Sequence, residues 1–128
     1  MNGPTILVVD DERSISEVIS LYLTRAGYRV KIANDGQSAL KELARQMPDL
    51  VVLDLMLPEV DGLEITRRLR AVGDTPIIMV TAVTEKTGFK FSPETDGEYL
   101  PADDYISKPV PVSELLARVN RLLAVQGG

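Results

Sequence analysis

The chain has no cysteine, no histidine and no tryptophan, and aromatic residues make up only 5% of its 128 positions. Without cysteine it can form no disulfide, and without histidine it can form neither a Ser/His catalytic pair nor a His-ligated zinc site. No phosphohistidine can form on it, so any histidine chemistry has to come from a partner. The chemistry that remains belongs to 19 Asp and Glu and 14 Lys and Arg, which leave a net charge of -5.

Long apolar runs are also absent. Every apolar stretch is far shorter than the roughly 20 residues that span a bilayer, and residues 1–4 show no basic stretch leading into an apolar signal core. We therefore expect a cytoplasmic protein without membrane contact. The net charge of -5 argues against direct nucleic-acid binding, which depends on clustered Lys and Arg. A length of 128 residues predicts one domain, residues 1–128.

Short apolar runs alternate with segments whose apolar residues recur every three or four positions. This alternation predicts an α/β fold with a doubly wound, five-stranded parallel sheet. The expected strands are residues 5–9, 29–33, 50–53, 77–80 and 105–107, and the expected helices are residues 14–26, 35–46, 61–72 and 112–125. Asp35 is expected to cap the second of these helices. The half-polar second strand suits a sheet edge, and the third, apolar on both faces, suits the centre. The first helix is expected to turn five residues inward: Ile15, Val18, Ile19, Tyr22 and Leu23.

The alternation breaks between residues 84 and 101. Gly88, Pro93, Gly97 and Pro101 stand in this stretch, and no apolar stripe runs through it. The composition predicts that the helix expected after the fourth strand is shortened or replaced by a loop or hairpin. A tolerated surface insertion and an altered output or dimer surface both remain open for this segment.

Several expected strands run into polar side chains. Asp10 and Asp11 follow the first strand, Asp54 the third, Thr81 the fourth and Lys108 the fifth. The carboxyl ends of parallel strands share one edge of the sheet, where ligands bind at the point of reversed strand order. We therefore expect these side chains to form one pocket. The acidic residues after the first strand argue against a glycine-rich phosphate loop of the kind that binds nucleotides.

Neighbouring carboxylates repel each other by about 4 kcal/mol per close pair at an effective dielectric constant of 20, so a cation is expected among them. Magnesium suits an all-oxygen site in a chain without His or Cys. A carboxylate can also carry a phosphoryl group as an acyl phosphate. Asp54 stands alone and suits that role, whereas the adjacent acid pair suits the metal, and Lys108 and Thr81 supply an ammonium and a hydroxyl for the transferred group. The alternative is that these aspartates only cap turns.

Taken in order, these segments resemble the receiver domains of two-component response regulators. The matching segments are residues 6–12, 49–58 with Asp61-Gly62, 76–82 and 102–109. The resemblance covers nearly the whole chain and implies a flavodoxin-like sheet with strand order 2-1-3-4-5. It also implies phosphorelay signal transduction, in which Asp54 accepts a phosphoryl group from a sensor histidine kinase or a histidine phosphotransfer domain.

The resemblance also implies a role for each site residue. It places Mg²⁺ on four residues, the last through its main-chain carbonyl: Asp10, Asp11, Asp54 and Met56. It assigns contact with the phosphoryl group to Lys108 and Thr81, and the conformational switch to Thr81 and Tyr105. The implied protein is a phosphoacceptor rather than an enzyme, with self-catalysed phosphoryl transfer and dephosphorylation only.

Two other functions remain open. A pseudo-receiver would serve as an interaction module that phosphorylation does not regulate. A magnesium-dependent phosphatase would need a second acid two residues after the nucleophile, where Met56 stands.

A homodimer through the face from the fourth strand to the last helix is a further expectation. Its charged residues resemble the dimer face of regulators that drive winged-helix domains: Asp103, Asp104, Glu114, Arg118 and Arg121. A solvated helix face is the alternative reading of these charges.

Overall fold

The computed structural model describes residues 3–54, 62–81, 103–107 and 110–127. The described elements are β1 Thr5–Val9, α1 Arg13–Arg25, β2 Arg29–Ala33, α2 Gly36–Arg45, β3 Leu50–Asp54, α3 Gly62–Val72, β4 Ile77–Thr81, β5 Asp104–Ser107 and α5 Val112–Gly127. The strands pair in parallel in the order β2-β1-β3-β4-β5, so the predicted α/β parallel sheet is confirmed. The predicted loss of a helix between residues 84 and 101 lies outside the described residues. No helix in the described part is long and apolar enough to cross a membrane.

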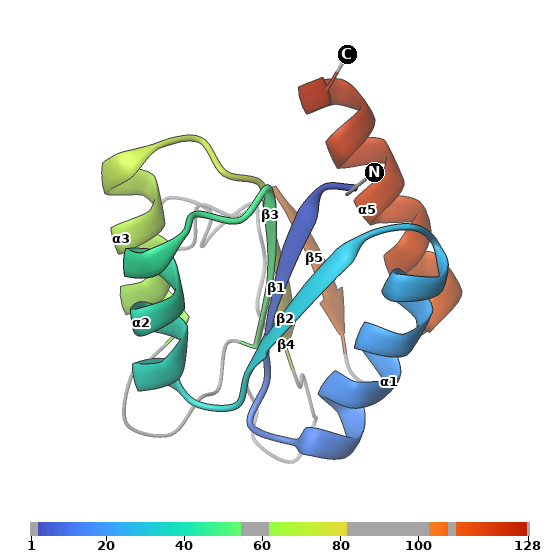
Figure 1. Ribbon diagram of the computed structural model, residues 1–128, viewed down its shortest axis with the longest axis horizontal. Coiled ribbons are helices and arrows are strands. Elements are labelled where there is room, and N and C mark those ends of the chain that lie inside the picture. Colours follow the sequence, from blue (N-terminus) through green and yellow to red (C-terminus); the bar gives the residue numbers. More distant parts are fainter. Residues whose placement is uncertain (1–2, 55–61, 82–102, 108–109, 128) are drawn as a thin grey trace.

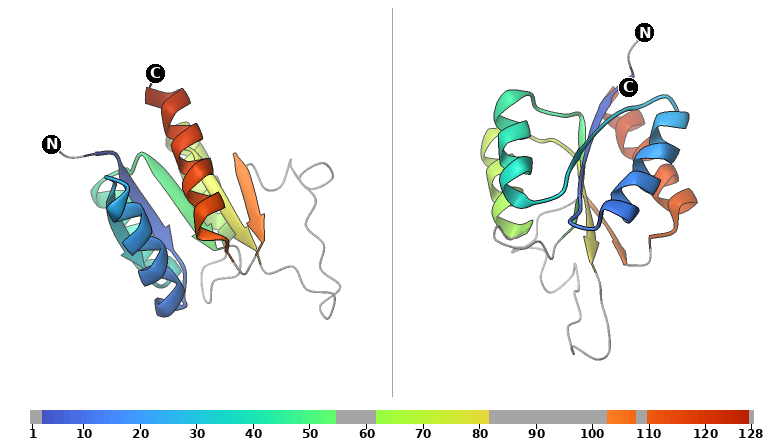
Figure 2. Two further views of the ribbon diagram at one scale, coloured as in Figure 1. Left: turned by 90° about the vertical axis from the view of Figure 1, so that its right-hand side faces the viewer. Right: turned by 60° about the horizontal axis from the view of Figure 1, so that its bottom comes forward.

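The sheet lies between two helical layers, with α2 and α3 on one face and α1 and α5 on the other (Figure 1; Figure 2, right). Alternate residues of β1 therefore enter different cores: Leu7 packs in the cluster beneath α2 and α3, whereas Ile6 packs in the cluster beneath α1 and α5. Because both faces are covered, β1 and β3 are buried throughout, as expected for central parallel strands. β2 lies at the edge, as predicted, and is mostly half-buried or exposed.

Helix α1 buries a narrower stripe than the sequence predicts. Ile19 and Leu23 are buried and Ile15 is half-buried, but Val18 and Tyr22 are each 46% exposed. The prediction for Val18 and Tyr22 was wrong. The helix turns its i, i+4 row toward the sheet, and the residue before each member of that row is rotated by about 100° away from it.

Helix α2 begins at the cap that the sequence predicts. The Asp35 backbone is extended, and its Oδ1 accepts a hydrogen bond of 2.7 Å from the Ser38 backbone N–H. This bond satisfies one of the free donors at the helix start. The bond holds the β2–α2 connection at the carboxyl ends of the strands, where β1 and β3 also end (Figure 1).

The cap makes the stability of the fold depend on pH. The hydrogen bonds from the Ser38 backbone, and secondly from its side chain, lower the pKa of Asp35. A carboxyl whose pKa is lower in the folded state stabilises the fold above its unfolded pKa, and this contribution is lost as the pH falls through the folded value. Asp35→Ala should therefore lower the urea midpoint at neutral pH and lower it less at about pH 3. Asp35→Asn is the control, because its amide oxygen still accepts the bond; an Ala variant equally destabilised at both pH values would contradict the prediction.

Candidate functional site

Two buried aspartates lie on neighbouring strands at the carboxyl edge of the sheet. The parallel register pairs Val9 of β1 with Leu53 of β3, so Asp10 and Asp54 are the next positions along the two chains. Neighbouring strands run about 4.8 Å apart. Asp10 and Asp54 are each only 2% exposed. The fold therefore holds two acid groups side by side and largely out of water.

The β1–α1 connection is fixed at Asp10 by three hydrogen bonds. The Asp10 backbone N–H donates to the Ala33 carbonyl at 3.1 Å, and its own carbonyl accepts from the Asn34 side-chain amide at 2.8 Å. The Asp10 carboxylate accepts from the Glu12 backbone N–H at 2.9 Å. The first two bonds connect Asp10 to the end of β2 and the third closes a local turn, so the carboxylate is held in one place.

Three successive acids form a cluster on this connection. Asp10, Asp11 and Glu12 each offer a carboxylate oxygen, and these oxygens lie within 4.8 Å of one another. Asp11 and Glu12 are exposed, so the cluster opens to solvent above the buried Asp10. Glu12 is the N-cap residue of α1, and its side chain makes no capping bond. Sequence reasoning did not include Glu12 among the metal ligands, although its place in the acid run is the signal that could have found it.

The donor set of this edge suits a hard divalent cation. Every candidate ligand group is an oxygen, and two of the carboxylates are buried where like charges repel strongly. Mg²⁺ prefers oxygen ligands and is typically bound through one or two carboxylates. The residues present therefore fit a magnesium ion.

Thr81 reaches the same edge from β4. The register pairs Asp54 with Val80, so Thr81 is one position beyond the partner of Asp54. Thr81 is in turn paired with Ser107, the last residue of β5, and Lys108 follows directly in the chain. The backbone thus brings the ends of β3, β4 and β5 to one side of the sheet.

The remaining predicted site residues are placed only in part. Lys108 and Met56 lie outside the described residues. Tyr105 is a residue of β5, where its backbone is paired with Met79 of β4. Its position on β5, the strand that Lys108 follows, is what the structure adds to the switch hypothesis.

Two polar residues that the sequence analysis does not single out, Asn34 and Ser16, connect the ends of β1 and β2 to the start of α1 by hydrogen bonds. The Asn34 amide donates to the Ser16 hydroxyl at 3.1 Å as well as to Asp10, and the Ser16 hydroxyl donates to the Arg13 carbonyl at 3.1 Å. Ser16 is fully buried. A serine beside the apolar stripe of α1 is a weak signal by itself, because a hydroxyl there can simply bond to the preceding helical turn.

The fold and the site define a doubly wound α/β domain with an acidic, cation-suited edge at the carboxyl ends of its strands. Residues 6–120 match the family of response regulator receiver domains, and the chain belongs to that family. Response regulator MprA of Mycobacterium leprae is 45% identical over 122 residues, which cover 92% of this chain and 50% of that protein. The receiver domain of the Francisella response regulator 1452 superimposes with a TM-score of 0.82 at 32% identity, covering 97% of this chain and 99% of that one.

Membership establishes the general function that the sequence analysis predicted. The chain is a receiver domain of two-component signal transduction, a phosphoacceptor and not a classical enzyme. A second similar structure, the response regulator TrrA of Thermotoga maritima, was solved in complex with Mg(2+)-BeF; its TM-score is 0.79 at 34% identity, covering 94% of this chain and 99% of that one. The chain spans about half the length of the curated relatives it matches.

Proposed function

We propose that this chain, as one receiver domain over residues 1–128, accepts a phosphoryl group on Asp54 in a magnesium-dependent reaction and thereby switches an interaction surface. The observation that carries the proposal is the buried Asp54 at the end of the central strand, in register beside the buried Asp10. The proposed donor is a phosphohistidine of a sensor histidine kinase or of a histidine phosphotransfer domain. The absence of histidine from this chain supports a donor from outside.

The chemistry follows from a carboxylate held in place. An Asp54 carboxylate oxygen attacks the phosphorus, the phosphorus–nitrogen bond of the donor breaks, and the electron pair stays on the imidazole, which takes up a proton. The product is an acyl phosphate on Asp54. Hydrolysis by water at phosphorus then restores the carboxylate and releases phosphate. Positioning and neutralisation of charge account for most of the catalysis in such transfers.

The proposed magnesium ligands are the carboxylates of Asp10, Asp11 and Asp54 and the main-chain carbonyl of Met56. When bound, the ion would neutralise charge on the carboxylates and on the incoming phosphoryl group. Asp10 supports this assignment through burial and Asp11 through its place in the acid cluster.

Three further residues are proposed to contact the phosphoryl group or to transmit its arrival: Lys108, Thr81 and Tyr105. Lys108 would contact the phosphoryl group by its ammonium and Thr81 by its hydroxyl, and Thr81 and Tyr105 would transmit the change outward. Thr81 lies on β4, the strand paired with β3, and Tyr105 lies on β5. These backbone positions support the assignment. We also propose that the helix expected after β4, between residues 84 and 101, is shortened or replaced by a loop or hairpin. This difference would alter the surface that the switch changes.

The test is covalent labelling. The protein is incubated with Mg²⁺ and acetyl phosphate and its intact mass is followed with time. A mass increase of one phosphoryl group that depends on Mg²⁺ is the expected result. No adduct on the folded wild-type protein would favour the pseudo-receiver, an interaction module that phosphorylation does not regulate.

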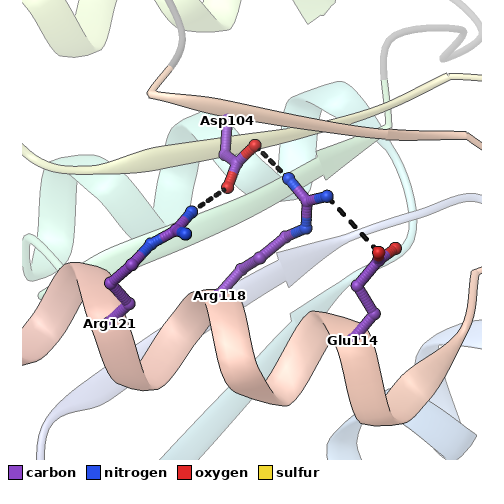
Figure 3. Close-up of polar contacts among 4 residues, drawn as sticks. All are labelled: Asp104, Glu114, Arg118 and Arg121. Atoms are coloured by element: carbon purple, nitrogen blue, oxygen red, sulfur yellow. Dashed lines mark hydrogen bonds and ion pairs between the residues drawn. The ribbon is translucent and has the colours of Figure 1, made fainter.

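We further propose a homodimer through the face formed by β4, β5 and α5. Asp104 on β5 pairs with Arg118 and with Arg121 on α5, the latter at 2.9 Å, and Arg118 also pairs with Glu114 at 3.4 Å (Figure 3). The Arg121 side chain is 67% exposed, so it can reach a second copy while remaining near Asp104. This charge pattern is what supports the proposal.

Reversal of one charge tests the dimer. Arg121→Glu should weaken dimerisation of the phosphorylated protein by at least about tenfold, because Glu repels Asp104 and any acid of the partner. It should change monomer stability by less than about 1 kcal/mol, as expected for an exposed ion pair. The dimer constant is measured by sedimentation equilibrium, and Arg25→Glu on α1 is the matched control. Equal dimerisation of both variants and the wild type would rule out this face.

A further inference from the structure

We propose that Asn34 is a positioning residue for the acid cluster: its side-chain amide holds the connection that carries Asp10 and Asp11, and thereby sets the affinity of the site for magnesium. The inference rests on the proposed function, because it concerns the proposed metal site. Asn34 itself need not touch the ion.

The register places Asn34 next to the cluster. β1 and β2 are paired up to Val9 and Ala33, so Asp10 and Asn34 are the next residues of adjacent strands. From there the Asn34 amide nitrogen donates to the Asp10 carbonyl at 2.8 Å and to the Ser16 hydroxyl at 3.1 Å. One amide group therefore links three segments: the end of β2, the end of β1 and the first turns of α1.

The Asn34 link adds to the other hydrogen bonds that hold this helix start. Glu12 occupies the N-cap position of α1 without making a side-chain capping bond. Besides the bonds that Asp10 makes with the Ala33 carbonyl and the Glu12 backbone N–H, the connection is held by Asn34 and by the Ser16 hydroxyl, which donates to the Arg13 carbonyl at 3.1 Å. Ser16 is fully buried, so its hydroxyl has little access to water as a replacement partner.

Repulsion among the carboxylates of the acid cluster opposes their close spacing. Asp10, Asp11 and Glu12 carry like charges within 4.8 Å of one another, so their repulsion favours a more open connection. A donor bonded to the Asp10 carbonyl opposes that opening and keeps the carboxylates gathered. Groups that orient metal ligands from outside the coordination sphere typically change metal affinity by about 10- to 100-fold when removed.

Two substitutions separate positioning from simple electrostatics. Asn34→Ala removes the amide without changing the charge. Asn34→Asp keeps the shape, removes the donor and adds a negative charge. Coulomb attraction alone predicts tighter Mg²⁺ binding by the Asp variant, whereas loss of positioning predicts that it binds no tighter than the wild type. The Asp variant thus separates the two explanations: tighter Mg²⁺ binding follows from the added charge alone, and equal or weaker binding follows from lost positioning.

A matched control removes a comparable contact elsewhere. Asn120 on α5 accepts a hydrogen bond from the Tyr28 hydroxyl. Tyr28 directly precedes β2 and so lies at the amino end of that strand, whereas the acids lie at the carboxyl ends of the strands. Asn120→Ala therefore deletes an asparagine that also joins two segments, but far from the acids. If Asn34 had only a structural role, both Ala variants would lower the urea midpoint and neither would change the affinity for Mg²⁺.

The experiment is isothermal titration of Mg²⁺ into the full chain, with urea unfolding of each variant. We expect Asn34→Ala to weaken Mg²⁺ binding by about tenfold, Asn34→Asp to bind no tighter than wild type, and Asn120→Ala to bind as wild type. A wild-type chain that binds no Mg²⁺ would sink the proposed function and this inference with it. A wild-type chain that binds Mg²⁺, together with an Asn34→Ala variant of the same affinity or a tighter Asn34→Asp variant, would overturn the inference alone.

Discussion

Asp54→Asn is expected to abolish the phosphoryl adduct that forms on the wild-type protein with Mg²⁺ and acetyl phosphate. An amide of the same shape has no anionic oxygen to attack phosphorus, so covalent transfer stops at its first step. The fold should persist, because Asp54 is 2% exposed and the change removes a buried charge rather than a packing contact. Intact mass measured with time gives the extent of labelling, and circular dichroism reports the fold.

Asp49→Asn is the matched control for that experiment. Asp49 directly precedes β3, at the other end of the strand that Asp54 completes, and its carboxylate accepts from the Thr5 backbone N–H at 2.7 Å. An amide oxygen can accept the same bond, so this variant should be labelled as fast as the wild type. An undiminished adduct on Asp54→Asn would show that another acid is the nucleophile, with Asp10 and Asp11 as the candidates.

Asp10→Asn is expected to weaken Mg²⁺ binding by about a hundredfold or more and, without Mg²⁺, to stabilise the fold. The loss of affinity follows because one of two buried carboxylates at the site becomes neutral. The gain in the free energy of unfolding, on the order of 1 kcal/mol, follows because Asp10 no longer repels Asp54 across adjacent strands. Asn keeps an oxygen for the bond that Asp10 accepts from the Glu12 backbone. Calorimetric titration and urea unfolding measure the two effects.

Asp11→Asn is the control that shows how much of the effect on stability depends on burial of the carboxylate. Asp11 belongs to the same cluster but is exposed, so its repulsion is screened by water and its replacement should change stability by less than about 0.5 kcal/mol. Both variants should lose Mg²⁺ affinity. If Asp10→Asn destabilised the free protein instead, the carboxylate would be supported by its surroundings more than it is repelled, and the need for a cation would be smaller than proposed.

Much of the architecture could be predicted from local pattern. The apolar run before Asp54 and the half-polar run from Arg29 to Ala33 were placed at the centre and edge of the sheet, where the structure has them. These predictions succeed because burial on two faces or on one leaves a direct trace in hydrophobic periodicity. The cap at Asp35 was predictable for a similar reason, since the bond to Ser38 spans only three residues.

The rotation of α1 and the pairing of charges were not predictable in the same way. Val18 and Tyr22 belong to an apolar stripe wide enough to be buried, yet the position of the sheet beneath α1 leaves both exposed. Asp103 is predicted to belong to a charged dimer face, but its carboxylate accepts hydrogen bonds of 2.8 Å from Arg70 on α3 and from the Ile77 backbone N–H. Both results depend on segments that are distant in the chain and meet only after folding.

The sequence by itself determined the class of fold, the acids that end β1 and β3, and the family to which the chain belongs, because each depends on residue type and order along short segments. Only the tertiary structure decided that Asp10 and Asp54 are buried in register on adjacent strands and that Asn34 holds the connection between β1 and α1. Asn34 and Asp10 are 24 positions apart, and no local pattern encodes a bond over that distance. Pairing of β2 with β1 brings the two residues together.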